Sequence, residues 1–367
     1  MPKRRPAKKR SPAAAVLLAV LCLLLLAVSR YLDSRSESAA SVLAPEAAQA
    51  DAPKLEVHFL DIGQGDSALL FCGDETLLID GGKVKNNQKL IARLKELEVD
   101  HLDAVICSHP DEDHCGGLSA VLASTRTDAF YCSVDSWHTK AFSDVTKYVA
   151  EQGISVTVPQ AGDTFAFSDA SVEFLGPVVD YGDDPNEGSL VARVRYGETS
   201  FLFTGDMGFE AEDDMLAAGV DVSATVLKVA HHGSAGSSST EFLQAVHPQY
   251  AVISVGADND YGHPTEAALN RLAACGIPVY RTDLLGEIIA VSDGKTVTMT
   301  TASSEAPSAD AASQTTDSYG YVGNSSSTVV HLASSGKLPG ESNRVYFASL
   351  DEALAAGYRK HASCLGS

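Results

Sequence analysis

The sequence predicts an α/β protein in which two β-sheets pack together and helices cover both outer faces. Short apolar runs alternate with Gly-rich turns along residues 54–301, a pattern typical of strands. Two such groups of strands are each followed by segments with helical spacing, which favours two sheets with a helical layer on each. Apolar residues make up 45% of the 367 residues, enough for a globular core.

The individual elements follow from the periodicity of apolar residues. Strands are expected at residues 55–60, 67–72, 76–79, 104–107, 172–175, 190–196, 200–204, 225–229, 251–255 and 279–281. Helices are expected at residues 88–97, 139–152, 210–218, 240–246 and 265–275.

The amino terminus reads as a targeting segment. Residues 1–10 are strongly basic and residues 13–28 are uncharged and rich in leucine, which predicts a signal peptide or signal anchor over residues 1–30. A helix over the apolar run is roughly 24 Å long, shorter than the ~30 Å hydrocarbon core of a bilayer. We therefore expect an extracytoplasmic protein, held at the cell membrane by this helix or secreted. No protein partner is identifiable.

Composition divides the remainder into a large body and a small tail. Residues 31–53 and 302–318 are low-complexity linkers rich in Ala, Ser and acidic residues, on either side of the body at 54–301. Residues 319–367 form a small tail module. The formal net charge is −21, whereas nucleic-acid-binding proteins are usually basic. Lys83, Lys85 and Lys89 are the nearest approach to a basic strip.

The strongest chemical signal is His109-Pro-Asp111-Glu-Asp113-His114, directly after a predicted buried strand. An irregular turn there would let these side chains converge on one point. Imidazole and carboxylate without thiolate suit Zn²⁺ or Mn²⁺ in a hydrolytic site. The alternative, a solvated acidic loop, would place two histidines and two aspartates at a strand end by chance.

Other predicted strand ends supply further candidates for the same site. Asp206 follows one strand in Thr204-Gly-Asp206, and His231-His232 follows the next. His263-Pro264 comes after the strand at 251–255, although a lone His-Pro in a loop is also ordinary. Asp80, in Leu78-Ile-Asp80-Gly-Gly, is expected to orient the ligand loop as a hydrogen-bond acceptor rather than to bind metal.

Together these motifs resemble a known family. His109-x-Asp111-x-Asp113-His114 is similar to the metallo-β-lactamase-fold signature His-x-His-x-Asp-His, with Asp111 in place of the second histidine. The segments at 60–67, 204–206, 228–234 and 262–264 also resemble the hydrolase domain of ComEC-type competence proteins. The resemblance covers residues 54–301 and implies an αβ/βα four-layer sandwich.

The resemblance also implies two divalent metal ions and their ligands. Asp206 matches a bridging carboxylate, and Asn186 stands near a position where the family has a further histidine. An oxygen-rich first site favours Mn²⁺ over Zn²⁺. The implied metal ligands are His109, Asp111, Asp113, His114, Asp206, His231 and His263, and the expected supporting residues are Asp66, Asp80 and Asn186.

The leading functional interpretation is an exported nuclease or phosphodiesterase acting on DNA or another phosphodiester. A hydroxide activated by the two ions would attack phosphorus, with Asp113, His231 and His232 as catalytic residues. A hydrolase of a small lactone, thioester or nucleotide is the alternative, and the acidic charge favours it. A third interpretation is a binding protein without catalysis.

The tail resembles the small zinc-binding module related to the amino-terminal domain of the Ada repair protein. The family's four ligand positions hold His331, Ser335, His361 and Cys364 here, so one ligand is lost and one thiol is replaced by imidazole. His331, His361 and Cys364 are the candidate ligands. The alternative is a module without metal that packs or binds a partner.

Overall fold

The computed structural model describes residues 54–257 and 259–301, together with residues 321–324, 327–332, 344–347 and 350–360 of the tail. The predicted anchor at 1–30 and the linkers at 31–53 and 302–318 lie outside the described residues. Within the described ranges, no helix is both long and apolar enough to cross a bilayer.

The first sheet is mixed and has eight strands in the order β17-β16-β1-β2-β3-β5-β7-β8. β1, β2 and β3 form an antiparallel meander, and β5, β7 and β8 continue from β3 in parallel. The strands are β1 (Leu55–Phe59), β2 (Ala68–Cys72), β3 (Glu75–Ile79), β5 (Ala104–Cys107), β7 (Phe130–Cys132), β8 (Val156–Thr157), β16 (Ile288–Ser292) and β17 (Val297–Thr301).

The second sheet has seven strands in the order β15-β14-β13-β12-β11-β10-β9. β9 to β12 are antiparallel, and β12 to β15 are parallel, so β12, β13 and β14 end at the same edge. The strands are β9 (Thr164–Phe167), β10 (Ala170–Gly176), β11 (Val191–Tyr196), β12 (Thr199–Phe203), β13 (Val226–Lys228), β14 (Tyr250–Ile253) and β15 (Val279–Arg281). A separate pair joins β4 (His101–Leu102) to β6 (Arg126–Thr127).

Helices follow the strands in each half. Side-chain caps fix several starts: Thr139, Ser239 and Thr265 each accept a hydrogen bond from a backbone N–H of the first turn, at α5, α7 and α8. The helices are η1 (Val84–Asn86), α2 (Asn87–Glu96), α3 (Glu112–Cys115), α4 (Leu118–Ser124), α5 (Lys140–Glu151), α6 (Phe209–Ala217), η2 (Ala230–Gly233), α7 (Thr240–Val246), α8 (Glu266–Ala274) and α9 (Thr282–Leu285).

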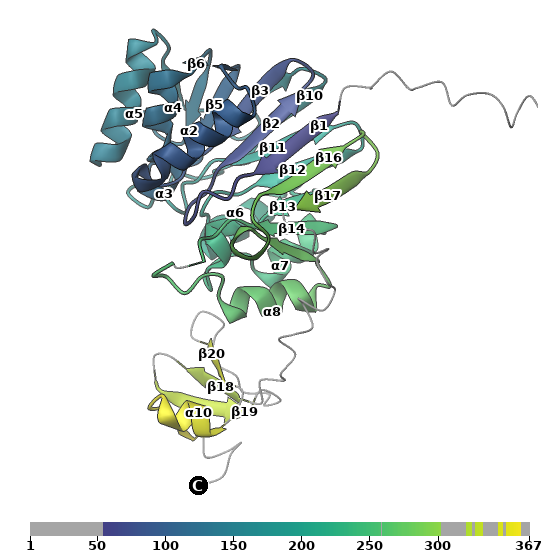
Figure 1. Ribbon diagram of the computed structural model, residues 1–367. Helices are drawn as coiled ribbons and strands as arrows, with labels where there is room; N and C mark the ends of the chain where they lie inside the picture. Colours follow the sequence, from purple (N-terminus) through teal and green to yellow (C-terminus); the bar gives the residue numbers. More distant parts are fainter. Residues whose placement is uncertain are drawn as a thin grey trace, which may run out of the picture. The chain divides into compact units, whose positions relative to one another are not determined.

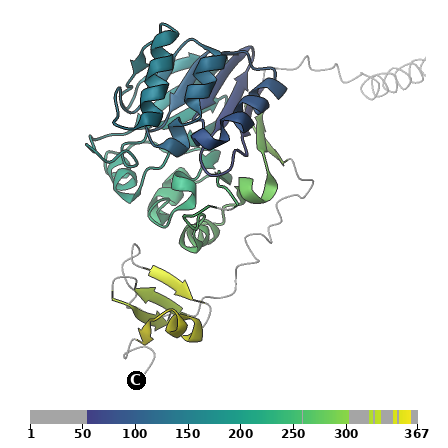
Figure 2. The same ribbon diagram turned by 60° about the vertical axis from the view of Figure 1, so that its left-hand side comes forward.

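Three buried apolar clusters define four layers. One lies between the sheets, where the rings of Phe59 in β1 and Phe203 in β12 stack at 5.9 Å. A second joins the first sheet to α2, α4 and α5, and a third joins the second sheet to α6, α7 and α8. Figure 1 shows the two helical groups beside different strands, and Figure 2 shows the same separation from another direction. The predicted αβ/βα sandwich with mixed sheets is confirmed.

Most predicted strands and helices are present with shifts of one or two residues at their ends. One local prediction was wrong, and several elements were not predicted, among them β7 and β9. The 109–114 motif is not an irregular turn throughout, because Asp113 and His114 lie in the helical turn α3. The hairpin β16–β17, which pairs with β1 and extends the first sheet, was not predicted.

The described part of the tail contains a four-stranded sheet in the order β20-β18-β19-β21 and one helix. Val330 and Ala353 are buried at its centre. The elements are β18 (Tyr321–Asn324), β19 (Val329–Leu332), β20 (Arg344–Phe347), α10 (Leu350–Ala355) and β21 (Arg359–Lys360).

Candidate metal centre

The candidate residues follow the carboxyl ends of strands that belong to both sheets. His109 comes after β5 of the first sheet, and Asp206 and His232 come after β12 and β13 of the second. Because the carboxyl ends of parallel strands meet at one edge, the loops from the two sheets converge there.

A group of four buried side chains has ligand atoms within 4.8 Å of one another: Asp66, His114, Asp206 and His232. Asp206 lies between the histidines. Its Oδ1 is 3.1 Å from His114 Nε2, and its Oδ2 is 3.6 Å from His232 Nε2. The Asp113 Oδ2 atom is also close, at 3.7 Å from His232 Nε2. One carboxylate thus faces imidazoles with both of its oxygens.

Several atoms in this cluster are buried without a hydrogen bond of good geometry, although His114 Nε2 and Asp206 Oδ1 lie 3.1 Å apart. They include the Nε2 atoms of His109, His114 and His232 and the Oδ1 atom of Asp206. Orphaned polar atoms in a protein interior are costly unless an unseen group satisfies them. Imidazole nitrogens and a carboxylate oxygen that converge without partners match the donor set of a divalent transition metal. The residues therefore fit a metal site.

His109 and Asp111 extend the cluster. The rings of His109 and His114 are 4.1 Å apart, and His109 Nε2 is 3.9 Å from Asp111 Oδ2. The other nitrogen of His109, Nδ1, is 3.0 Å from Ser108 Oγ and 3.3 Å from Ser189 Oγ. These two hydroxyls hold the ring so that Nε2 faces the cluster.

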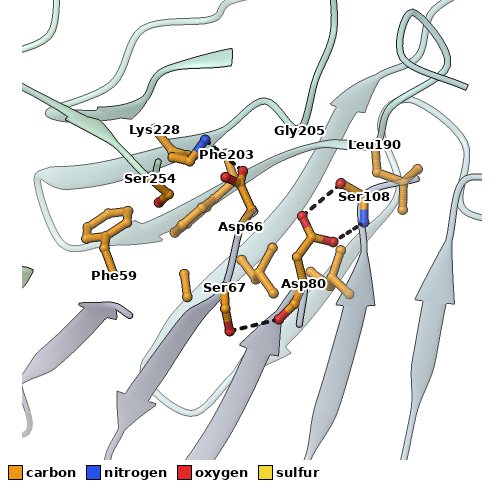
Figure 3. Close-up of a pocket in the computed structure, with 13 residues that line it drawn as sticks. Phe59, Asp66, Ser67, Asp80, Ser108, Leu190, Phe203, Gly205, Lys228 and Ser254 are labelled. Carbon is orange, nitrogen blue, oxygen red and sulfur yellow. Dashed lines mark hydrogen bonds and ion pairs between the residues drawn. The ribbon is translucent and has the colours of Figure 1, made fainter. Parts of the chain in front are cut away.

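Asp80 holds the 108–114 segment through hydrogen bonds to Ser108 and a close contact with His114. Its carboxylate accepts hydrogen bonds from Ser108 N at 2.7 Å and Ser108 Oγ at 2.8 Å, and it lies 2.9 Å from His114 Nδ1. Figure 3 shows the contacts between Asp80 and Ser108. This is the carboxylate–histidine arrangement that fixes a ligand's tautomer and ring orientation.

His232 is oriented through its Nδ1 atom, which donates to the Ser254 carbonyl oxygen and lies beside the Asp66 carboxylate. His232 Nδ1 lies 3.0 Å from Asp66 Oδ1 and 2.9 Å from the Ser254 carbonyl oxygen, and Lys228 Nζ lies 2.7 Å from Asp66 Oδ2. In Figure 3, the Lys228 ammonium lies directly against the Asp66 carboxylate. Both residues line a small cavity of about 10 Å³, room for roughly one water. The ion pair is thus almost completely removed from solvent.

The histidines at the site divide into two electrostatic groups. Burial, reinforced by the neighbouring His114, lowers the pKa of His109 to about 3. Burial, reinforced by His232 and His231, lowers that of His263 to about 4. Both rings are neutral at pH 7 and have a lone pair available for a cation.

The other group is dominated by carboxylates. Burial opposes protonation of His232, but Asp206 and Asp66 outweigh it and raise its pKa to about 9. Burial is likewise outweighed at His114, where Asp206 and Asp80 raise the pKa well above its ordinary value. Protons on these imidazoles compensate the buried carboxylates, and a bound cation would replace them.

The three other predicted site residues, His231, His263 and Asn186, lie at the edge of the cluster or outside it. His231 Nε2 is 3.7 Å from Asp206 Oδ2, and the ring of His263 is 5.7 Å from that of His231. His231 is more exposed than His232, 32% against 1% of the side chain, and both have left-handed backbone, with φ of 50° and 53°. Asn186 has a buried Oδ1 without a hydrogen-bond partner, and its backbone carbonyl accepts from Ser189 N, the residue whose hydroxyl contacts His109.

The tail candidates are separate. His331 lies in β19 and is buried. His361 and Cys364 lie outside the described residues, so the predicted tail site is not tested.

Sequence reasoning missed Lys228, Ser189 and Ser108 as supports of the site. Lys228 was visible as a lysine inside a predicted buried strand, where an unpaired ammonium is costly and an acidic partner is required. The serines gave no comparable signal.

A four-layer αβ/βα sandwich with a histidine–aspartate cluster at one edge is the architecture of a class of metal-dependent hydrolases. The chain belongs to the metallo-β-lactamase superfamily, whose family model matches residues 60–257.

Curated relatives carry competence names. The chain is 34% identical over 285 residues to competence protein ComA of Neisseria gonorrhoeae, covering 76% of this chain and 38% of that protein. It is 31% identical over 251 residues to ComE operon protein 3 of Bacillus subtilis, covering 64% and 32%. The predicted resemblance to ComEC-type competence proteins is confirmed. The chain spans only about a third of the length of these relatives.

Solved structures show more distant similarity. The metallo-β-lactamase-fold protein YhfI of Bacillus subtilis aligns with a TM-score of 0.45 at 15% identity, over 68% of this chain and 100% of that one. CmlA, a diiron β-hydroxylase of Streptomyces venezuelae, aligns with a TM-score of 0.43 at 15% identity, over 63% and 53%.

Proposed function

We propose that this chain is an exported, metal-dependent phosphodiesterase that cleaves nucleic acid. The observation that carries the proposal is the set of buried, unpartnered imidazole and carboxylate atoms of His109, His114, Asp206 and His232. Its relatives named as competence proteins favour a nucleic-acid substrate over other esters.

The residues that would hold two divalent cations are His109, Asp111, Asp113, His114, Asp206, His232 and His263. Such cations, Mn²⁺ or Zn²⁺, would supply Lewis acidity and lower the pKa of bound water. Asp80 and Asp66 keep the rings of His114 and His232 in position through their Nδ1 atoms.

His231 is suited to proton transfer. It is about a third exposed, and its Nε2 faces the Asp206 carboxylate at 3.7 Å, at the solvent side of the cluster. From there it can donate a proton to the leaving oxygen. His232 is buried and cannot reach a leaving group on the solvent side. We therefore assign proton transfer to His231.

Export is part of the proposal and is supported by the sequence alone. The basic residues 1–10 followed by the apolar residues 13–28 are typical of a signal peptide or signal anchor. The direct measurement is cell fractionation with protease accessibility, in which the body should be degraded from outside the cytoplasmic membrane.

A small-substrate hydrolase is the second candidate. The net charge of −21 favours it, because such a protein repels a polyanion at long range. Salt dependence separates the two: cleavage of a polynucleotide weakens steeply with added salt, and turnover of a small neutral ester does not.

The test is cleavage of plasmid and single-stranded DNA by the full-length chain, stripped of metal and then supplied with Mn²⁺ or Zn²⁺. We expect metal-dependent cleavage that Asp113→Ala reduces by at least about a hundredfold, because one cation loses a ligand. Asp128→Ala is the matched control, since Asp128 lies beside His101 in a separate, more exposed acidic cluster.

Two results would contradict the proposal. Metal binding without cleavage of any DNA would exclude a nuclease and direct the search to lactones and thioesters. Equal cleavage by the Asp113→Ala and Asp128→Ala variants would show that this cluster is not the active site.

A further inference from the structure

An exposed aromatic ring stands beside the candidate metal centre. Tyr261, in the loop between β14 and α8, is 58% exposed, and Val84, next to Lys83, is 45% exposed. Single exposed apolar side chains are ordinary on protein surfaces, so the contacts of Tyr261 at the candidate site carry more weight than its exposure. We call Lys83, Val84, Tyr261 and His263 the rim.

The ring of Tyr261 is held in place. It stacks on His263 with 5.8 Å between centroids and 12° between planes, and its backbone N–H donates to Asn259 Oδ1 at 3.1 Å. The Asn259 side chain also donates to the carbonyl oxygens of Gly256 and His263, at 2.9 Å and 2.7 Å. A rigid exposed aromatic loses little entropy when a flat ligand stacks on it.

Lys83 places a cation between the ring and the cluster. Its Nζ donates to Tyr261 Oη at 3.2 Å, lies 4.8 Å from the centre of that ring, and is 4.0 Å from Asp113 Oδ2. An ammonium group has three donor hydrogens, so it can bind an anion while it keeps the tyrosine contact.

An exposed aromatic ring with an ammonium group against it matches a base and its phosphate. We propose that the rim binds one unpaired nucleotide, with the base on Tyr261 and the adjacent phosphate on Lys83. This inference rests on the proposed phosphodiesterase activity and specifies its substrate as single-stranded or frayed nucleic acid. A base inside a duplex has both faces covered by its neighbours and cannot stack on Tyr261.

Stacking would also allow an acidic protein to bind a negatively charged nucleic acid. With a net charge of −21, the chain gains little from long-range attraction to a polyanion. Base–aromatic stacking does not depend on net charge, since every base has a π-face.

The test is the affinity of the full-length chain for a fluorescein-labelled single-stranded oligodeoxynucleotide with phosphorothioate linkages, measured by anisotropy. Tyr261→Leu should raise Kd roughly tenfold, the order expected for the loss of one stacked base, and Tyr261→Trp should retain affinity. Lys83→Gln should make the plot of log association constant against log salt concentration less steep, by about 0.7.

The chain offers a matched control pair. Lys147 lies 4.5 Å from the ring centre of Tyr148 in α5, in the helical layer of the first sheet. Tyr148→Leu and Lys147→Gln should leave both affinity and salt slope unchanged. An oligonucleotide in which every nucleotide is abasic should bind equally to the wild-type chain and to Tyr261→Leu, because it has no base to stack.

The experiments distinguish an incorrect rim proposal from an incorrect proposal about the enzymatic activity. If the wild-type chain cleaves DNA but Tyr261→Leu binds as tightly as Tyr148→Leu, the rim proposal is wrong and the nuclease stands. If no phosphodiester is cleaved but Tyr261→Leu still weakens binding, the rim stands and the activity assignment is wrong. Equal loss of affinity for a blunt duplex would contradict the choice of an unpaired nucleotide.

Discussion

At the scale of single residues, the candidate metal centre depends on a charge that is not itself a proposed ligand. Lys228 is buried in β13, where only 4% of its side chain is exposed, and it neutralises Asp66, which in turn orients His232. Lys228 Nζ also donates to the Val229 carbonyl oxygen at 2.8 Å, so the ammonium has fixed partners on two sides. Three residues thus act as one unit behind the site.

Removing this ammonium should be costly. Lys228→Met leaves the Asp66 carboxylate buried without its counter-charge, and we expect the free energy of unfolding to fall by about 3–5 kcal/mol. Urea denaturation followed by circular dichroism measures the change.

Lys140→Met is the control, because Lys140 pairs with Asp144 on the surface and its side chain is 87% exposed. Exposed pairs of this kind contribute about 0–1 kcal/mol. Similar destabilisation in the two variants would mean that the buried pair has no special role, and recovery of stability in a Lys228→Met/Asp66→Leu double variant would support it.

At the scale of elements, the turn α3 is positioned by a glycine in a distant loop. Gly65 has φ of +130°, and a Cβ added there would collide with the Asp113 carbonyl oxygen and lie 3.1 Å from Gly82 Cα. The neighbouring Asp66 N–H donates to that same carbonyl at 3.0 Å. The loop before β2 therefore holds the backbone of a proposed ligand.

Gly65→Ala should move Asp113 and weaken Mn²⁺ binding, measured by isothermal titration calorimetry, in addition to lowering Tm. Gly153→Ala separates the steric cause from backbone strain, since Gly153 also has a positive φ, +77°, but has no atom within 4 Å of the added Cβ. That control should cost about 1 kcal/mol and leave metal affinity unchanged. Equal Mn²⁺ affinities in the two variants would refute the positioning role of Gly65.

The sequence allowed most elements to be predicted because apolar periodicity survives wherever an element has one buried face. The hairpin β16–β17 was missed, although Asp293-Gly294 between runs rich in β-branched residues is a recognised turn signal. The left-handed backbone at His231 and His232 could not be predicted, since only the packed loop determines it. For the same reason, spacing alone could not tell which of the two histidines is buried.

At the scale of the whole molecule, the candidate site joins the two sheets. His109 and His114 belong to the first half of the chain, and Asp206 and His232 to the second, so a bound cation would link both halves. Among the described residues, the charges beside the buried carboxylates of Asp66 and Asp206 are those of Lys228 and of the imidazoles of His114 and His232.

Metal removal should therefore destabilise the entire body. At a metal concentration of about 100 times Kd, binding adds about 2.7 kcal/mol, which corresponds to a Tm increase of roughly 5–10 °C. Differential scanning fluorimetry with and without EDTA measures the shift, and Asp206→Asn should reduce it. An unchanged Tm on addition of Mn²⁺ would argue against a metal that bridges the halves.

The division of ligands between the halves also sets an order of events during synthesis. When the ribosome has completed the 109–114 motif, the chain holds the first ligands of the site, but Asp206 and His232 are still unmade. The first sheet itself stays open at β1 until β16 and β17 are added near residue 301. A cation could thus be captured only after both groups of ligands have been made, so a complete site would show that the two sheets have come together.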